Sequence, residues 1–264
     1  MLIADHSAWT KLVLSGFDRK KFLNGLVTCD VFKLKAGEGG LCCLLTPKGR
    51  LRADFELYDR GEDLLMLATP LAGANLKEDL SKKLILSEST LADISLEYAL
   101  FHLSGPDEAV SGAEGFPETR YADDGRWLLV AAGAAEALKK ASMTPEAWEA
   151  LRVRRGVPLY GVDMGEETIP QEAKLDAALT FDKGCYMGQE TISRVHHMGH
   201  INKVLVRLKV SGPLADQAAL QSQGQEVGAI TSYEDGFALG TVRLKESEVG
   251  TQLIALPATP VEVI

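Results

Sequence analysis

The alternation of hydrophobic and polar residues predicts a chain of short strands with helices between them. Residues 9–16 have strand character and end on a glycine, and Asp18 is placed to cap the helix that follows. Residues 39–69 have β character interrupted by two turns, which predicts an antiparallel meander. The apolar residues of the first helix are Phe22, Leu23, Leu26 and Val27; the strands of the meander are 41–45, 51–58 and 64–67, followed by a helix over 71–86 with apolar residues at 76, 80 and 84.

The second half of the chain has a different pattern. Strands are predicted at 99–103 and 127–131, with short helices between and after them. Thr144 followed by Pro145 predicts the start of a helix, and the Gly156-Val157-Pro158 run predicts its end, after which the chain becomes irregular and rich in glycine. From Lys203 onward hydrophobic residues recur with period two, and the short strands predicted at 204–210, 227–232, 237–244 and 252–256 are typical of a small barrel or sandwich.

Composition places the chain among globular proteins of two or three lobes. It has 264 residues, of which 46% are hydrophobic and 25% are charged. No apolar run reaches the length of a membrane-spanning helix, and the first residues lack the pattern of a secretory signal, so we expect a cytoplasmic protein with no membrane association. The net charge of -9 argues against direct binding to nucleic acid but leaves room for a small basic pocket.

The four cysteines have no metal-binding spacing. Cys29, Cys42, Cys43 and Cys185 contain no C-x-x-C pair. Cys42 and Cys43 are adjacent in a predicted strand, so their side chains point to opposite faces. We therefore predict that both are small core residues.

Residues 183–190, here called the signature segment, concentrate chemically active groups. The sequence Lys-Gly-Cys-Tyr-Met-Gly-Gln-Glu combines a cation, a thiol, an aromatic ring, an amide and a carboxylate with two glycines that permit close approach of another backbone. If the segment is extended, Lys183 and Cys185 share a face, and the ammonium favours the reactive thiolate. The alternative is a tight turn whose glutamine and glutamate side chains tie down the loop backbone.

The signature segment resembles the K-G-C-Y-x-G-Q-E motif of the YgfZ-type folate-binding proteins, which are relatives of the aminomethyltransferase (T-protein) of the glycine-cleavage system. The resemblance covers nearly the whole chain and its segments occur in the family's order. The other matching segments are 22–30, which is similar to F-L-x-G-x-x-T-N-D, the turn at 45–50, and the stretches 155–161 and 169–172.

The resemblance implies an α+β, T-protein-like fold of three lobes around a central opening, with antiparallel sheets, helices and a C-terminal β-barrel. Residues 1–200 would form a folate-binding region of two interleaved α+β lobes, and residues 201–264 the barrel. It also implies that the chain binds tetrahydrofolate or a one-carbon derivative and supports assembly or repair of iron–sulfur clusters, and thereby tRNA modification by iron–sulfur enzymes. The expected partners are a reduced folate and iron–sulfur assembly proteins or client enzymes.

The resemblance further implies the residues of the site. A pterin presents adjacent N–H donors that suit a carboxylate, its ring needs an apolar slot, and the glutamate tail of folate suits arginine. Asp54 would match the aspartate that T-proteins place near the reacting nitrogen. The predicted catalytic residues are Cys185, Lys183 and Asp54, and the predicted folate contacts are Asn24, Thr28, Asp30, Arg154, Glu172, Tyr186, Gln189, Glu190 and Arg194.

The chain departs from the family pattern at two positions. Cys29 stands where the family usually has asparagine, which places an oxidisable thiol near the predicted site. Arg154 stands where T-proteins carry a glutamate that holds the pterin, and the loss of this acceptor costs about 1–3 kcal/mol. This change makes the T-protein reaction less expected. The cluster of Arg152, Arg154 and Arg155 is either a solvated last helical turn or a grip for the folate tail.

The H-H-x-x-H run of His196, His197 and His200 has a spacing that could hold zinc or iron on a helix. Gly199 disfavours a helix there and no glutamate lies between the histidines, so we predict an exposed loop and no metal.

Three functions are compatible with these observations. The preferred one is a tetrahydrofolate-binding accessory protein for iron–sulfur cluster assembly or repair. The second is a folate-dependent aminomethyltransferase or methyltransferase, and the third is a non-catalytic scaffold with a vestigial pocket.

Overall fold

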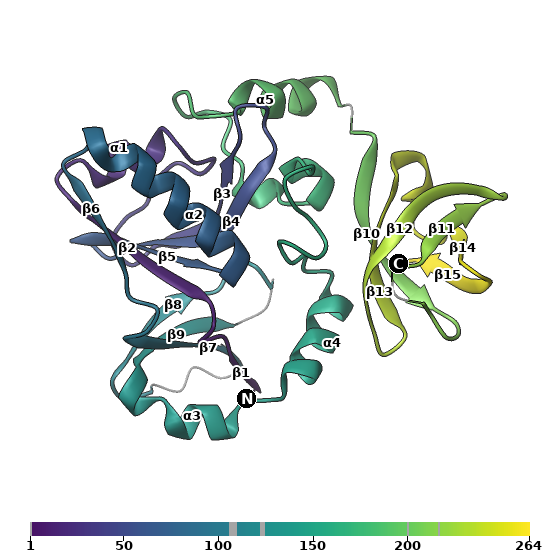
Figure 1. The fold of residues 1–264 in the computed structure, drawn as a ribbon, viewed down its shortest axis with the longest axis horizontal. Coiled ribbons are helices and arrows are strands. Elements are labelled where there is room, and N and C mark those ends of the chain that lie inside the picture. Colours follow the sequence, from purple (N-terminus) through teal and green to yellow (C-terminus); the bar gives the residue numbers. More distant parts are fainter. Residues whose placement is uncertain (1, 106–109, 122–124, 200, 216) are drawn as a thin grey trace. The chain divides into compact units, whose positions relative to one another are not determined.

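The computed structural model describes residues 2–105, 110–121, 125–199, 201–215 and 217–264 (Figure 1). The chain divides into two compact units. The first unit comprises Met1–Pro145 and Ala177–Gln189, and the second comprises Glu146–Asp176 and Glu190–Ile264. The domain boundary predicted at residues 200 and 201 stays a prediction.

An antiparallel five-stranded sheet forms one half of the first unit, in the order β3-β4-β5-β2-β6. It contains the predicted meander, which is thereby confirmed, and the helix α2 packs against its central strands through Leu76 and Leu80 (Figure 1). The elements are β2 (Thr10–Gly16), α1 (Arg19–Asn24), β3 (Gly39–Leu45), β4 (Leu51–Asp59), β5 (Asp63–Ala68), α2 (Pro70–Lys83), the 3-10 turn η1 (Leu84–Leu86) and β6 (Ser89–Asp93).

The first helix differs from the prediction. Asp18 does precede α1, but its side chain makes no capping bond; its Oδ1 instead accepts hydrogen bonds from the hydroxyls of Ser87 at 2.8 Å and Ser89 at 2.5 Å. The helix ends at Asn24, and Val27 beyond it pairs with Leu44 in an isolated β-bridge. Tertiary partners therefore override the local helical pattern at both ends of α1.

A second antiparallel sheet, in the order β1-β7-β9-β8, completes the first unit. The sequence predicted short helices between its two central strands, but the strand β8 lies there and pairs with β9 along its whole length. A strand of five residues with an exposed glutamate and a glycine carries no periodic signal, so only its partner fixes its structure. The elements are β1 (Leu2–Asp5), β7 (Tyr98–Ser104), β8 (Ala113–Pro117), β9 (Arg126–Ala131), the 3-10 turn η2 (Ala132–Ala134) and α3 (Glu136–Ala141).

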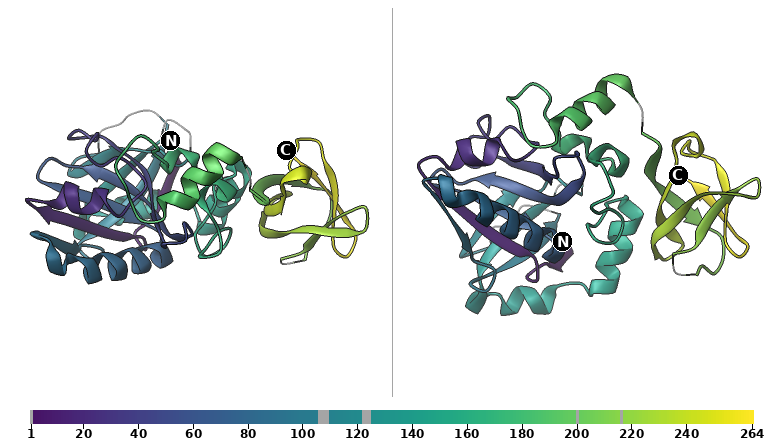
Figure 2. Two further views of the ribbon diagram at one scale, coloured as in Figure 1. Left: turned by 90° about the horizontal axis from the view of Figure 1, so that it is seen from above. Right: turned by 45° about the horizontal axis from the view of Figure 1, so that its top comes forward.

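The second unit contains a closed β-barrel with the strand order β10-β13-β12-β11-β14-β15, which Figure 2 shows from two further directions. Val204, Val206, Leu208 and Val210 are buried in its core, which confirms the predicted period-two pattern. Sequence reasoning missed β11, which is only four residues long, and β15, which contains Pro260, because shortness and proline both weaken a strand signal. The strands are β10 (Lys203–Val210), β11 (Ala219–Ser222), β12 (Gln225–Glu234), β13 (Phe237–Arg243), β14 (Gln252–Ala255) and β15 (Thr259–Val263).

Helices and turns precede the barrel. The helix α4 has the predicted bounds, and Gly156 follows it with a φ of 79°. A further helix, α5, begins inside the signature segment, where an irregular chain was expected. The elements are α4 (Pro145–Arg155), the 3-10 turns η3 (Pro170–Ala173) and η4 (Asp176–Ala178), and α5 (Gln189–Met198); a further 3-10 turn, η5 (Leu244–Glu246), lies between β13 and β14 of the barrel. Within the part of the chain that the structure describes, none of the helices is long and apolar enough to cross a membrane.

Arg152 holds α4 in place within the second unit. Its guanidinium is 2% exposed and donates to the carboxylates of Glu149 and Asp163, to the carbonyl of Val157 at 2.6 Å and to the hydroxyl of Ser232 at 2.8 Å. Asp163 is buried as well and also accepts a hydrogen bond from the Ser232 hydroxyl. The arginine cluster seen in the sequence is therefore split, because Arg152 is internal whereas Arg154 is exposed above the ring of Phe237.

We expect Arg152→Ala to lower the free energy of unfolding by about 3–5 kcal/mol, because it leaves Asp163 buried without its counter-charge. The matched change Arg154→Ala removes one exposed stacking contact and should cost about 1 kcal/mol or less. Urea unfolding followed by circular dichroism measures both. Equal losses for the two variants would contradict the assignment of Arg152 as the internal anchor.

Candidate functional site

The signature segment lies in the first unit up to Gln189, where α5 begins. Lys183 lies in a bend, and the chain is irregular from residue 184 to 186, so the extended geometry that would align Lys183 with Cys185 is not formed. The Cys185 thiol is free and exposed.

Lys183 ties the signature segment to the loop that follows α1. Its ammonium donates to three backbone carbonyls, those of Asn24 at 2.8 Å, Val27 at 2.7 Å and Cys29 at 2.6 Å. Burial lowers the pKa of Lys183 to about 8, while three acceptors around the nitrogen favour its protonated form at neutral pH. The three donors of the ammonium are thus committed to the loop, and its nitrogen lies 5.0 Å from the centre of the Tyr186 ring.

Thr28 reinforces the same connection. Its buried hydroxyl donates to the carbonyl of Ala178 at 2.6 Å and accepts from the amide of Cys43 at 2.9 Å, and its carbonyl accepts from the amide of Thr180 at 3.1 Å. The predicted folate contacts Asn24 and Thr28 therefore both belong to this connection. The Asn24 side chain accepts from the amide of Val31 at 3.0 Å.

Gly188 lets the signature segment touch the turn between β3 and β4. Its φ is 81°, and a Cβ atom at this position would lie 2.6 Å from the carbonyl oxygen of Thr46 and 3.0 Å from the Cα of Gly49. A side chain is excluded by both the conformation and the contact. Three segments that carry the family resemblance, around residues 24–29, 46–49 and 183–188, therefore meet in the first unit.

Tyr186 and Asp30 complete the predicted contacts near Lys183. The Tyr186 side chain is 6% exposed, and its hydroxyl has no hydrogen-bond partner among the described residues. Burial, with a smaller contribution from the nearby Cys43, raises the pKa of Tyr186 to about 12, so it is a neutral donor. Asp30 accepts from the amide of Phe32 and pairs with the exposed Lys33 at 3.5 Å.

The cysteine prediction requires a correction. Cys42 is fully buried as expected, but it forms a disulfide with Cys29, with the two Cα atoms 5.2 Å apart. The Thr28 contacts place the loop after α1 against β3, which brings the two residues within the range of a disulfide. Cys43 points to the opposite face of the strand and remains a buried free thiol, as predicted.

Asp54, the predicted carboxylate near a reacting nitrogen, lies in a buried charge cluster. It is paired across the strands with Cys43, is fully buried, and accepts a hydrogen bond from the guanidinium of Arg120, whose Nε lies 3.7 Å from the carboxylate of Glu56. Burial alone would lower the pKa of Arg120, but the carboxylates of Asp54 and Glu56 outweigh it and raise the pKa. Sequence reasoning missed Arg120, because it stands in an irregular segment with no motif.

Burial and the contacts of this cluster favour the protonated form of Glu56. Burial raises the pKa of the Glu56 carboxyl, in spite of the opposing effect of Arg120. The hydroxyl of Tyr58 lies 2.8 Å from the carbonyl of Pro117 and 3.1 Å from Glu56 Oε2, yet it carries a single proton. A proton on Glu56 satisfies the second contact and leaves Arg120 and Asp54 as a neutral pair.

We expect Glu56→Gln to change how stability depends on pH. The folded protein holds a proton on Glu56 that the unfolded chain releases above its ordinary pKa of 4.5, so the contribution of this group is complete below that pH and is lost as the pH rises toward the folded pKa. The glutamine variant should therefore gain stability relative to wild type by up to about 1.4 kcal/mol per pH unit above pH 5. Thermal unfolding between pH 5 and pH 8 measures this difference. The exposed Glu114→Gln serves as the control, and parallel curves for wild type and Glu56→Gln would refute the protonated state.

The remaining predicted folate residues lie in the second unit, except Gln189, which lies at the end of the first. Arg154 is exposed, and Glu172 is 7% exposed and accepts from the amide of Ile169 at 3.2 Å. Glu190 and Arg194 form an exposed ion pair on α5 with a nitrogen–oxygen distance of 2.8 Å. These five assignments, like the roles predicted for the other site residues, stay predictions.

The histidine run is partly helical, contrary to the loop that the sequence suggested. His196 and His197 lie exposed on α5, and Gly199 ends the helix with a φ of 70°. His200 lies outside the described residues. Among the residues that the structure describes, no group of three or more His, Cys, Asp or Glu side chains could hold a metal ion.

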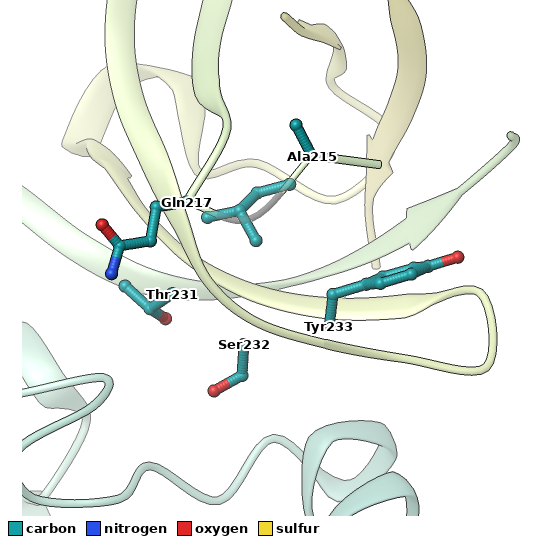
Figure 3. A pocket seen from close by; sticks show the side chains of 6 residues that line it. Ala215, Gln217, Thr231, Ser232 and Tyr233 are labelled. Atoms are coloured by element: carbon teal, nitrogen blue, oxygen red, sulfur yellow. The ribbon is translucent and has the colours of Figure 1, made fainter. Parts of the chain in front are cut away.

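Two cavities among the described residues of the second unit contain none of the predicted folate residues. One, of about 270 Å³, is bordered by Thr231, Ser232 and Tyr233 of β12 with Gln217 (Figure 3), and the first two hydroxyls already donate to Asp163. The other, of about 410 Å³, is lined by residues of η3, α5 and β10 together with neighbouring loop and η5 residues. Neither cavity changes the choice of site in the first unit.

We expect Gly188→Ala to displace the signature segment from the β3–β4 turn. A left-handed φ costs an alanine about 1–2 kcal/mol, and the contact with the Thr46 carbonyl adds to it, so the free energy of unfolding should fall by at least about 2 kcal/mol. Gly184→Ala is the matched control, because a Cβ there meets no atom within 4 Å. Chemical denaturation measures both variants. A Gly188→Ala protein as stable as Gly184→Ala would contradict the contact.

Comparison with known proteins shows which domain families and which fold this chain is similar to. The GCVT N-terminal domain family matches residues 1–110, and the CAF17 C-terminal β-barrel domain family matches residues 202–264. The crystal structure of the glycine cleavage system aminomethyltransferase T from Bartonella henselae superposes with a TM-score of 0.81 over 99% of this chain and 84% of that chain, at 19% identity, which shows that the fold is the same. The fold is therefore that of the T-protein, as the sequence predicted.

The curated relatives refine this assignment. The tRNA-modifying protein YgfZ of Aliivibrio fischeri is 28% identical over 90% of this chain and 83% of the relative, and that of Yersinia enterocolitica is 28% identical over 93% and 82%. A chloroplastic protein of Arabidopsis thaliana is 26% identical over 95% of this chain and 67% of the relative. Residues 1–110 are thus similar to the GCVT N-terminal domain family, and the chain as a whole has the T-protein fold and is similar to the YgfZ-type proteins.

Proposed function

We propose that this protein binds tetrahydrofolate or a one-carbon derivative and acts as an accessory protein in the assembly or repair of iron–sulfur clusters, through which it supports tRNA modification. The observation that carries this proposal is the meeting of three motif segments around Lys183 in the first unit. The names of the YgfZ relatives support the link to tRNA modification. A cytoplasmic location, and iron–sulfur assembly proteins or client enzymes as partners, belong to the same proposal.

Buried polar atoms of the first unit could form hydrogen bonds with a pterin. The Tyr186 hydroxyl, the Oδ1 of Asp54 and the Nε and Nη2 of Arg120 are buried without a hydrogen-bond partner among the described residues. A pterin carries both N–H donors and acceptor atoms, so it can satisfy a carboxylate, a guanidinium and a hydroxyl together. Asp54, Arg120 and Tyr186 are the side chains that we propose to hold its polar edge.

The other residues of the site have supporting roles in this proposal. Lys183 and Thr28 position the loop after α1, and Gly188 seats the signature segment against the β3–β4 turn. When bound, the folate would supply a one-carbon unit or its reducing capacity. Cys185 supplies an exposed thiol on the signature segment.

The transferase alternative is weakened by electrostatics. A T-protein reaction needs a carboxylate that is free to act beside the reacting nitrogen, but Asp54 is neutralised by Arg120. Arg154, at the position of the family's pterin-binding glutamate, is a cation. The scaffold alternative has no comparable observation in its favour, since a vestigial pocket gives no reason for the buried polar atoms of Asp54 and Arg120 to remain.

Calorimetric titration with reduced folates tests the binding. We expect Lys183→Ala to weaken binding at least tenfold, because the loop after α1 loses three hydrogen bonds, and Lys82→Ala, which changes an exposed lysine on α2 of the same unit, to stay within twofold of wild type. Circular dichroism of each variant checks that it is folded. The absence of heat with wild type at millimolar folate would refute the binding half of the proposal.

Complementation of a deletion strain tests the proposed role in iron–sulfur cluster assembly or repair. In a strain that lacks the gene, wild type should restore the activity of iron–sulfur enzymes, and Cys185→Ala should restore much less. Equal rescue by Cys185→Ala would remove this thiol from the mechanism. An assay with a lipoyl-bound aminomethyl donor should show no turnover, and turnover would favour the transferase.

A further inference from the structure

We propose that the Cys29–Cys42 disulfide is a reducible lock on the signature segment, opened by a dithiol reductant and closed by the reverse exchange with the disulfide form of that reductant. The lock would give the same site a redox control. Its regulatory role rests on the proposed function. It is carried by the position of Cys29, whose sulfur is bonded to that of Cys42 on β3 and whose carbonyl oxygen accepts a hydrogen bond from the Lys183 ammonium.

The lock acts next to the part of the loop after α1 that pairs with β3. Val27 is held by its bridge to Leu44, and Thr28 by hydrogen bonds to Cys43 and Ala178. Cys29 comes next, and the disulfide joins it to the buried centre of β3. The third acceptor of the Lys183 ammonium is thus fixed by a covalent bond that can be broken and remade.

A reductant can approach the disulfide only from the side of Cys29. Cys29 is partly exposed, whereas Cys42 is fully buried. Cys43 cannot replace Cys42, since it points to the opposite face of β3, and burial raises the pKa of its thiol, which keeps it unreactive. The pairing of Cys29 with Cys42 is therefore specific, and a reductant meets the sulfur of Cys29 first.

The reaction is an ordinary thiol–disulfide exchange. A thiolate of the dithiol attacks the Cys29 sulfur, the Cys29–Cys42 bond breaks, and the Cys42 sulfur leaves with the electron pair and takes up a proton. The second thiolate of the dithiol then attacks the mixed disulfide, releases the Cys29 thiol and becomes a disulfide itself. Two electrons and two protons move from the dithiol to the cysteine pair.

Reduction loosens the acceptors of Lys183. The ammonium keeps the carbonyls of Asn24 and Val27, but the carbonyl of Cys29 is no longer tied to β3. A partly buried ammonium with fewer acceptors is less stable as a cation, and burial already lowers the pKa of Lys183 to about 8. The signature segment is then held by the two remaining hydrogen bonds of Lys183, by Thr28 and by the contact of Gly188, and its backbone opens more often.

Hydrogen exchange of the full protein, before and after incubation with dithiothreitol, tests the lock. Maleimide labelling of the denatured protein should count two thiols before reduction, from Cys43 and Cys185, and four after it. Exchange in the peptide that covers residues 183–189 should become at least fivefold faster on reduction, while exchange in β10 of the barrel stays constant. The double variant Cys29→Ser with Cys42→Ser should exchange at the fast rate in both conditions, and Cys185→Ser should respond like wild type.

The outcomes separate the lock from the proposed function. Four thiols before reduction, or an unchanged exchange rate after the count rises from two to four, would overturn the lock. A response lost in Cys185→Ser would assign the effect to the exposed thiol and also overturn it. Folate titration of the oxidised and reduced forms should show weaker binding after reduction, and equal binding would overturn the regulatory role. If neither form binds folate, the proposed function fails while the exchange result still decides whether the lock exists.

Discussion

The ammonium of Lys183 is the interaction on which the candidate site depends. The helix α1 ends at Asn24, and the carbonyl oxygens of its last turn have no partner inside the helix, as at any helix C-terminus. Lys183 arrives from more than 150 positions further along the chain and satisfies the carbonyl of Asn24 together with those of Val27 and Cys29. Hydrogen bonds to a charged group contribute about 1.5–3 kcal/mol each, which offsets the cost of burying the ammonium. An apolar side chain of the same length could not replace it, because it would leave all three carbonyls without this donor, and a neutral NH2 group could satisfy two of them at most.

The buried charges of the first unit explain why a T-protein fold need not perform the T-protein reaction. Asp54 and Glu56 lie two residues apart on β4, so both point into the same interior and would repel each other if both were ionised. One guanidinium, that of Arg120, and one retained proton on Glu56 leave the cluster without net charge. This arrangement stabilises the interior of the first unit, but it leaves no carboxylate free to serve as a base. The same cluster can still bind a neutral polar ring, which needs hydrogen-bonding atoms and no net charge.

Sequence reasoning located the elements whose side chains repeat regularly and missed those that depend on partners. The meander, α4 and the period-two strand β10 each had a pattern of their own, whereas β8, β11 and β15 are short and acquire their structure from neighbouring strands. In the site, residue types identified the signature segment, but the acceptors of Lys183 are backbone carbonyls, which every residue has and no motif can reveal. The disulfide was missed for a related reason. The separation of 13 residues between Cys29 and Cys42 is not distinctive, and only the folded loop brings their Cα atoms to 5.2 Å.

The Cys29–Cys42 disulfide and the hydrogen bonds of Lys183 both hold the loop after α1, and their contributions to stability are of similar size. Reduction of the disulfide therefore changes how firmly the loop is held. Closing a loop of about 15 residues with a disulfide stabilises a protein by about 3 kcal/mol in the chain-entropy account. The hydrogen bonds of Lys183 contribute on the same scale. If either contribution were much larger, reducing the bond would leave the loop unchanged or unfold it altogether. In a reducing compartment a disulfide persists only transiently, so a cytoplasmic protein with this pair would spend time in both states. The signature segment would then be held firmly in one state and loosely in the other, with the exposed Cys185 thiol on the part that moves.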